Sequence, residues 1–144
     1  MDGKRSIKQF VVFKLDDEEY GIDILRVKTI EKMSEITRVP RTVSYVKGVI
    51  NLRGEIVPII DLKERFNLSK TVLTENTRII IVYAEETTVG LIVDSATEVI
   101  DIDNELIEDP PESIDDTESG NVYGIGKLEE RIVILLDVLK ILNI

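Results

Sequence analysis

Residues 45–66, YVKGVINLRGEIVPIIDLKERF, decide the fold because they combine two strands, a turn and a helix start. The ranges 46–52 and 56–60 are apolar runs of strand length, and Arg53, Gly54 and Glu55 between them form a short glycine-containing turn. Turns of this kind join antiparallel strands, so the stretch predicts a β-hairpin. Asp61 then takes the N-cap position of a short helical turn that buries apolar side chains.

The same pattern recurs near the end of the chain. Residues 122–142 read VYGIGKLEERIVILLDVLKIL, and a gapless alignment places Gly48 on Gly124, Ile56 on Ile132 and Asp61 on Asp137. The repeat extends backwards, since residues 10–24 (FVVFKLDDEEYGIDI) align with residues 79–93 (IIIVYAEETTVGLIV). Two copies are too few for a solenoid. The repeat therefore predicts one fold built twice and packed about a pseudo-two-fold axis.

The repeat also sets the domain organisation. We expect a single domain over residues 1–144, with a first barrel repeat at 9–66, a second at 77–142 and a polar linker at 67–76 in which Leu68, Val72 and Leu73 are apolar anchors. Each copy offers about five short strands and one closing turn, the spacing of small antiparallel barrels. The predicted fold class is all-β, two barrels that share a core, and strand exchange between them remains open.

Two segments are harder to interpret. Residues 23–31 fit either a strand with a bulge or one helical turn, and we favour the strand. Residues 104–119 are the most acidic and least apolar part of the chain. We expect them to form a surface loop.

Composition excludes several classes of function. The chain has no cysteine and no histidine, which removes thiol chemistry, thiolate zinc sites and the commonest metal ligand. Its 28 acidic and 18 basic residues give a net charge of −10, which disfavours nucleic acid and acidic membranes as partners. The apolar runs are too short to cross a bilayer and residues 1–9 lack the apolar core of a signal peptide, so we expect a cytoplasmic protein without cofactor or metal.

Clustered carboxylates are the main candidates for catalysis. Residues 16–19 and Asp115 with Asp116 form two such clusters, but both fall in expected turns, where acids are solvated. General acid catalysis needs one carboxylate whose pKa is raised by burial. Asp61 and Asp137 recur at matching positions, and helix capping accounts for both. We therefore do not expect an enzyme.

Arg53 is the exception within the repeat. Its counterpart in the second copy is Glu129, so the hairpin tip is repeated in structure but not in charge. Arg53 is either an exposed turn residue or a partner-facing side chain beside Val27, Ile30 and Ile56. An asymmetric tip is what a protein with two different partners would need.

Four stretches resemble the CheW-like domain family of chemotaxis coupling proteins. They are YGIDILRVKTI at 20–30, VKGVINLRGEIVPIIDL at 46–62, GLIVD at 90–94 and VILLDVLKIL at 133–142, within a resemblance that spans residues 10–142. The same domain also occurs in the histidine kinase CheA and the adaptor CheV. Because no phosphotransfer helix or receiver is attached here, we expect the stand-alone coupling protein.

The resemblance implies two intertwined five-stranded SH3-like barrels and a non-catalytic adaptor that bridges methyl-accepting chemoreceptors to CheA at receptor arrays. It implies that a groove between the barrels receives the receptor tip, at positions that match Val27, Thr29, Ile30, Arg53, Ile56, Ile79 and Val99. It also implies a surface for the regulatory domain of CheA, which we expect around Arg38, Val39, Tyr45, Lys47 and Gly48.

Thr29 departs from the family pattern, since many relatives carry an acid there. Two alternatives stay open. The chain could be a regulatory module derived from a CheA or CheV polypeptide. A small-ligand-binding β-barrel is the alternative from a different class, and a deep polar pocket with a buried carboxylate pair would favour it.

Overall fold

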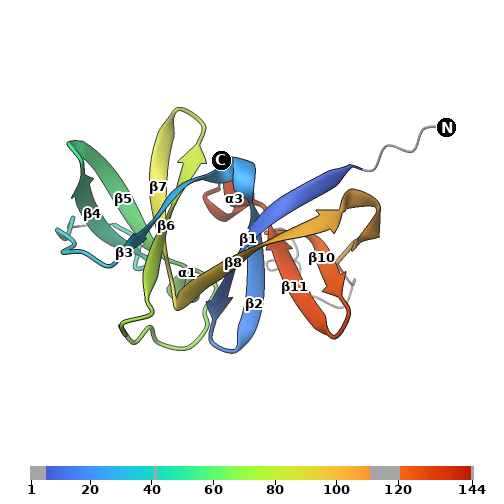
Figure 1. Ribbon diagram of the computed structural model, residues 1–144. Coiled ribbons are helices and arrows are strands. Elements are labelled where there is room, and N and C mark those ends of the chain that lie inside the picture. The colour runs from blue at the N-terminus through green and yellow to red at the C-terminus, as the bar shows by residue number, and fades with distance from the viewer. Residues whose placement is uncertain (1–5, 41, 111–120, 144) are drawn as a thin grey trace.

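A computed structural model describes residues 6–40, 42–110 and 121–143, which fold into two β-sheets with a few short helical turns (Figure 1). The six-stranded sheet has the order β8 (Ser95–Asp103), β1 (Ile7–Leu15), β2 (Glu18–Asp23), β11 (Arg131–Leu136), β10 (Val122–Leu128) and β9 (Ile107–Glu108). The five-stranded sheet has the order β3 (Val27–Lys32), β6 (Arg78–Ala84), β7 (Thr87–Val93), β5 (Glu55–Asp61) and β4 (Val46–Leu52). The helical turns are η1 (Ile24–Arg26), α1 (Leu62–Arg65), η2 (Asn104–Leu106) and α3 (Val138–Ile141).

The two copies of the repeat exchange their first hairpins. The β1–β2 hairpin lies in the six-stranded sheet beside the late strands of the second copy, and the β6–β7 hairpin lies in the five-stranded sheet beside the late strands of the first. Each exchange is made by a parallel pair, β2 with β11 and β7 with β5. Gly21 is paired with Leu135 in one and Gly90 with Ile59 in the other. Each sheet therefore contains strands from both copies.

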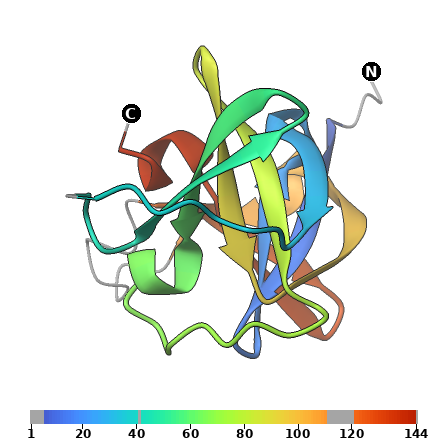
Figure 2. The same ribbon diagram turned by 90° about the vertical axis from the view of Figure 1, so that its left-hand side faces the viewer.

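In each curved sheet, the two edge strands are consecutive in the chain, β8 and β9 in one sheet and β3 and β4 in the other. β9 continues from β8 after η2, and the segment after β3 passes across the β4–β5 hairpin (Figure 2), where Thr37 forms a bridge to Val49. The fold class is confirmed as all-β with minimal helix. The strand counts are six and five rather than five and five, because the two-residue β9 pairs with β10 as a separate strand.

Three apolar clusters fill the structure. Each curved sheet encloses one cluster of its own, and the third, which we call the shared core, lies between the two sheets. Along β1, the side chains of Val11 and Phe13 belong to the shared core, whereas those of Phe10 and Val12 belong to the cluster enclosed by the six-stranded sheet. β6 does the same with Ile80 on one face and Ile79 on the other. The central parts of β1 and β6 are thus buried on both faces, as their uninterrupted apolar runs FVVF and IIIV indicate.

Glycine gives a close fit where the exchanged hairpins meet their parallel neighbours. A Cβ on Gly90 would lie 2.6 Å from Cδ1 of Ile59 and 2.7 Å from Cγ2 of Ile79. A Cβ on Gly21 would lie 2.9 Å from Cδ2 of Leu135. The close approach at these two points lets each hairpin join the opposite copy.

The short helices begin as the sequence predicts. The Asp61 carboxylate accepts a hydrogen bond from the Glu64 amide at 3.3 Å, and the Asp137 carboxylate accepts one from the Lys140 amide at 3.2 Å. Both capping predictions are confirmed. The two helices also contact each other, since Nε of Arg65 donates to the Ile141 carbonyl at 3.1 Å.

Some local predictions are wrong. Residues 23–31 combine both alternatives, because a 3₁₀ turn at Ile24–Arg26 precedes β3. The expected loop at 104–119 begins with η2 and β9, and its residues 111–119 lie outside the described residues. Val72 and Leu73 of the linker are 68% and 61% exposed, so they do not anchor it to the core. Isolated apolar residues in a polar linker carry no signal of which side they face.

Candidate partner-binding surfaces

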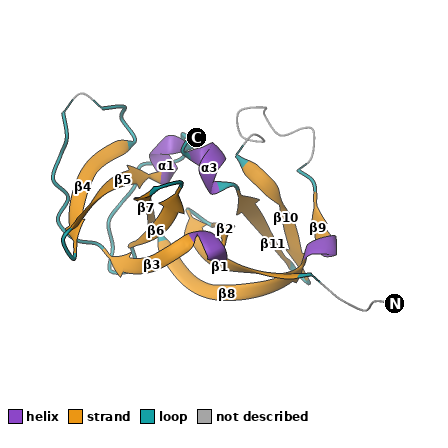
Figure 3. Ribbon diagram, turned by 90° about the horizontal axis from the view of Figure 1, so that it is seen from above, coloured by secondary structure: helices purple, strands orange, loops and turns teal. Residues whose placement is uncertain are grey.

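The shared core reaches solvent along two edge strands. β3 is the edge of one sheet and β8 the edge of the other, and both lie on the same face of the molecule (Figures 1 and 3). Ile30 is paired with Ile80, and Val99 is paired with Val11. Paired residues project to the same face of a sheet, so Ile30 and Val99 extend the shared core outward. They are 43% and 49% exposed.

Val27 completes this strand-edge surface, which consists of Val27, Ile30 and Val99. Val27 is half-buried and packs against the shared core. Thr29, which we expected at this surface, is paired with Ile81 of the cluster inside the five-stranded sheet, so its side chain projects to the other face of β3. A β-bulge lies between Val27 and Thr29, and an equivalent irregularity interrupts the pairing of β1 with β8 between Val12 and Phe13. The surface is therefore built in the same way on both sheets.

The β4–β5 hairpin brings Arg53 to this surface. Arg53 and Gly54 form a two-residue turn with φ angles of 51° and 88°, and the Gly54 amide donates to the Asn51 side chain at 2.8 Å. The Arg53 guanidinium lies 3.2 Å from Oε2 of Glu31 on β3. β3 and β4 are the two edge strands of the five-stranded sheet, and the curvature of the sheet brings the β4–β5 turn back to β3. The Arg53 side chain remains 68% exposed. It is positioned by one contact and available for another.

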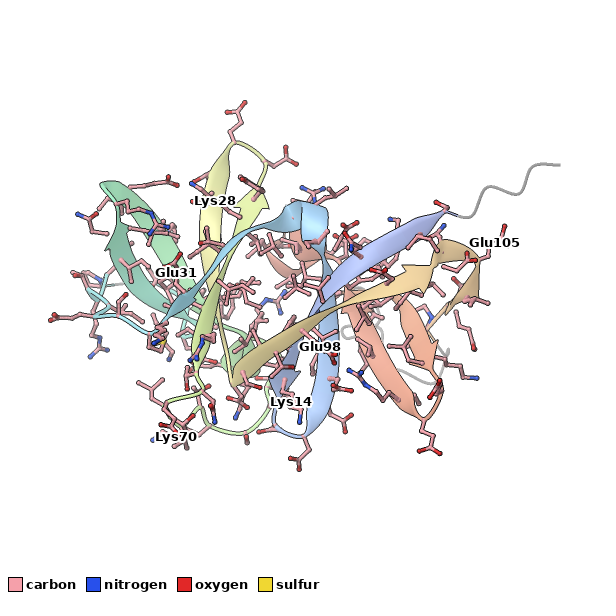
Figure 4. All side chains as sticks on the ribbon, viewed as in Figure 1. Lys14, Lys28, Glu31, Lys70, Glu98 and Glu105 are labelled. Carbon is pink, nitrogen blue, oxygen red and sulfur yellow. The ribbon has the colours of Figure 1, made fainter. Side chains whose placement is uncertain are left out.

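Glu31 is the fixed partner in this contact. The Thr29 hydroxyl and then the Arg53 guanidinium hold the pKa of Glu31 below its ordinary value, so the carboxylate stays ionised beside Arg53. Figure 4 labels Glu31 and Lys28 on β3. Lys28 bonds Oε2 of Glu55 at 3.2 Å, and Thr88 donates to Oε1 of Glu55 at 2.6 Å. These bonds tie the tip of the hairpin to β3 and β7.

The six-stranded sheet has a matching tie with the charges reversed. Arg131 aligns with Glu55 in the repeat, and it donates to both carboxylate oxygens of Glu19 at 3.0 and 2.9 Å as well as to Glu98 on β8. These hydrogen bonds raise the pKa of Arg131 and lower that of Glu19. The two halves share one geometry and differ in charge.

A second residue assigned to the receptor surface is misplaced. Ile79 is fully buried inside the five-stranded sheet, so its side chain cannot touch a partner. Ile79 belongs to a run of three isoleucines, and such a run gives no signal of which side chain faces outward. Ile56 is 60% exposed and remains available at the start of β5.

The second predicted surface lies around the segment that crosses the β4–β5 hairpin. Arg38 and Val39 are exposed, and Lys47 forms an ion pair with Glu64 of α1. Tyr45 is half-buried, with the Arg65 guanidinium 5.3 Å from its ring centre. We call Arg38, Val39, Tyr45 and Lys47 the loop surface.

Gly48 does not belong to the loop surface. It is buried with a φ angle of 140°, and a Cβ would lie 2.0 Å from the Thr37 carbonyl oxygen. The absence of a side chain on Gly48 lets the crossing segment pack against β4. Gly124 does the same for β9, since a Cβ on Gly124 would lie 3.1 Å from the Glu108 carbonyl. The sequence alone does not distinguish such a packing glycine from a glycine at a binding surface.

Sequence reasoning missed an open cavity of about 690 Å³ beside the loop surface. Arg38 and Lys47 line one part, and Leu68, Lys70 and Leu73 of the linker line another. Its carboxylates are already engaged, because Asp61 caps α1 and accepts from Thr71 at 2.8 Å and Glu64 pairs with Lys47. This arrangement does not match the buried carboxylate pair that a hydrolytic site would require.

The described residues offer little basis for other chemistry. Among residues 6–40, 42–110 and 121–143, no three acidic side chains are grouped so that they could hold a metal ion. Within the same ranges, no helix is long and apolar enough to span a membrane.

Comparison with known proteins agrees with this architecture. The family model of the CheW-like domain matches residues 9–144. Chemotaxis protein CheW of Klebsiella aerogenes is 40% identical over 136 residues, which cover 94% of this chain and 82% of that protein. CheW of Bacillus subtilis is 39% identical, with 94% and 87% covered. The crystal structure of the scaffolding protein TtCheW from Thermoanaerobacter tengcongensis gives a TM-score of 0.88 at 40% identity, covering 96% of this chain and 94% of that chain.

These matches are to chemotaxis and scaffolding proteins rather than to enzymes, which confirms the prediction of a non-catalytic protein. The family match extends over both copies of the repeat, and the structural match covers both sheets. The chain belongs to the CheW-like domain family.

Proposed function

We propose that this chain is a non-catalytic scaffold of bacterial chemotaxis that couples methyl-accepting chemoreceptors to the histidine kinase CheA. The observation that carries the proposal is the presence of two separate, partly apolar surfaces on one double barrel, in a chain that is 40% identical to chemotaxis proteins over most of its length. A bridge between a receptor and a kinase needs two such surfaces held by a stiff connector, because a state change passes only through differential contacts.

The strand-edge surface is the receptor side of this proposal. Ile30 and Val99 offer apolar side chains on two neighbouring edges, an arrangement suited to the apolar face of a helical hairpin. Arg53 stands at the margin of this surface, held by Glu31 and still largely exposed. We assign Arg53 to fixing the register of the receptor helices by a charge-assisted hydrogen bond.

The loop surface is the kinase side. Val39 is 40% exposed and is flanked by the cationic Arg38 and Lys47, so the surface combines an apolar centre with a charged margin. Tyr45 supports it from below by stacking against Arg65. The partner at this surface is the regulatory domain of CheA, and the protein works in the cytoplasm at receptor arrays to which it is brought by its partners.

The test is reconstitution. Receptor signalling fragments and CheA are combined with and without this chain, and autophosphorylation of CheA is measured. The proposal expects the chain to raise receptor-dependent kinase activity by about tenfold or more. Activity that is independent of the chain, with wild-type protein shown to be folded, would overturn it.

A further inference from the structure

We propose that Lys63 is a positioning residue that fixes the placement of the two barrels relative to each other, and with it the spacing of Ile30 and Val99. The inference rests on the proposed function and deepens it. It is drawn from an ionic cluster around a buried lysine, which is not itself part of either binding surface, although the neighbouring Glu64 and Arg65 of α1 contact Lys47 and Tyr45 of the loop surface.

The cluster joins segments from both sheets. Lys63 lies on α1, which directly follows β5 of the five-stranded sheet, and it is only 6% exposed. Its Nζ lies 2.9 Å from Oδ1 of Asp16 and 3.1 Å from Oδ2 of Asp94. Asp16 is in the β1–β2 turn of the six-stranded sheet, and Asp94 is the link where the chain passes from β7 to β8. One ammonium group therefore binds both sheets and the strand connection between them.

Further hydrogen bonds hold the two carboxylates in place. The Asp16 amide donates to Oδ2 of Asp94 at 2.7 Å, and the Asp94 amide donates to the Lys14 carbonyl at 3.0 Å. The Ser69 hydroxyl donates to Oδ1 of Asp16 at 2.5 Å. Burial lowers the pKa of Lys63, but its bonds to Asp16 and Asp94 outweigh burial and leave that pKa raised, so the ammonium stays charged.

The cluster is present on one side of the pseudo-two-fold axis only. In the second copy Leu139 stands at the position of Lys63, and Glu85 stands at that of Asp16. Elsewhere the two halves meet through the apolar shared core and through the hydrogen bond from Nε of Arg65 to the Ile141 carbonyl. Apolar burial is non-directional, whereas charge-assisted hydrogen bonds fix distance and angle. The two ion pairs of Lys63 are therefore a main determinant of how the halves are oriented.

The cluster is connected to Val99 of the strand-edge surface through β8. β8 begins at Ser95, the residue after Asp94, and carries Val99. Ile30 lies on β3 of the other sheet. A loosened Lys63 cluster would let Val99 move relative to Ile30 while both side chains keep their local surroundings. Binding to either partner would survive, and transmission between the partners would weaken.

The central variant is Lys63→Met, which removes the charge and keeps an unbranched side chain. Lys63→Arg is the conservative variant, because it keeps a cation within reach of both carboxylates. Lys140→Met is the matched control, since it removes one exposed lysine from α3, the counterpart of α1. Asp94→Asn tests the same cluster from the other side if Lys63→Met fails to fold.

Three readouts are measured for each variant. They are the dissociation constant for a receptor fragment, the dissociation constant for the CheA regulatory domain, and receptor-dependent kinase activation. Barrel placement is measured directly by distances between spin labels on cysteines introduced at Lys32 and Lys127, which is clean because the chain has no cysteine of its own.

In Lys63→Met we expect each dissociation constant to stay within about twofold of the wild-type value, the label distance distribution to broaden, and kinase activation to fall about fivefold. Lys63→Arg should restore part of the activation. Lys140→Met should resemble the wild type in all readouts. Unchanged activation and an unchanged distance distribution in Lys63→Met would overturn the inference. Failure of the wild type to activate the kinase would instead overturn the proposed function.

Discussion

Ile30 and Val99 occupy the same position in the two halves of the molecule. Ile30 is paired with Ile80 and Val99 with Val11, and Val11 aligns with Ile80 in the repeat. Two edge strands from different sheets thus present equivalent apolar residues on one face. The asymmetry that two different partners require comes from the charges around them, as with Arg53 and its counterpart Glu129.

Charge placed on the strand-edge surface should weaken receptor binding without unfolding the protein. Val99→Glu and Ile30→Glu each put a carboxylate where an apolar helix face would pack, and we expect receptor affinity to fall by about 10- to 100-fold. Titration with a receptor signalling fragment measures this. Val72→Glu is the matched control, since Val72 is 68% exposed and lies in the linker rather than on an edge strand. Equal affinity in Val99→Glu and wild type would contradict the assignment.

The loop surface should respond independently. Val39→Glu is expected to weaken binding to the CheA regulatory domain by about tenfold or more, because it buries a charge in the apolar centre of that surface. Receptor affinity should stay at the wild-type value. Val99→Glu serves as the reciprocal control and should bind the kinase domain normally. Loss of both partners in either variant would mean that the two surfaces are not separate.

A methyl group at Gly90 should destabilise the exchanged architecture. Its Cβ would meet Ile59 and Ile79 at 2.6 and 2.7 Å inside a packed sheet, so we expect Gly90→Ala to cost about 1–3 kcal/mol in unfolding free energy. Urea denaturation measures it. Thr87→Ala is the control, since Thr87 is exposed at the start of the same strand, with an expected change within about 0.5 kcal/mol. Wild-type stability in Gly90→Ala would show that the parallel pair can separate.

Glu19 should make stability depend on acid pH. The Arg131 guanidinium holds the pKa of Glu19 below its ordinary value of 4.5 in the folded state. A lowered folded-state pKa gives stabilisation that is present above the unfolded-state value and lost as pH falls through the folded-state value. Between about pH 6 and pH 3, the wild type should therefore lose more unfolding free energy than Glu19→Gln. Parallel curves for the wild type and Glu19→Gln would rule out the Glu19 contribution.

Local features of the fold could be predicted from sequence because short-range chemistry determines them. The hairpin around Arg53 and Gly54 and the caps at Asp61 and Asp137 are of this kind. The exchange of hairpins could not be deduced, since β1–β2 and β6–β7 carry the same apolar pattern and fit either sheet.

Residue roles that depend on distant contacts were also hidden. Ile79 and Ile30 are both apolar strand residues, and only the pairing of β3 with β6 shows that one is buried and the other exposed. Lys63 would be expected to face solvent on so short a helix, yet it is buried by carboxylates 47 and 31 residues away, Asp16 and Asp94.

The central claim is that one molecule holds both partners at once, and the mass of the mixed complex tests it most directly. Analytical ultracentrifugation of this chain with a receptor fragment and the CheA regulatory domain should show a species that contains all three. Val99→Glu should reduce it to the chain with the kinase domain, and Val39→Glu to the chain with the receptor fragment. If the receptor fragment and the kinase domain instead displace each other, so that only two-component species form, the scaffold account is contradicted.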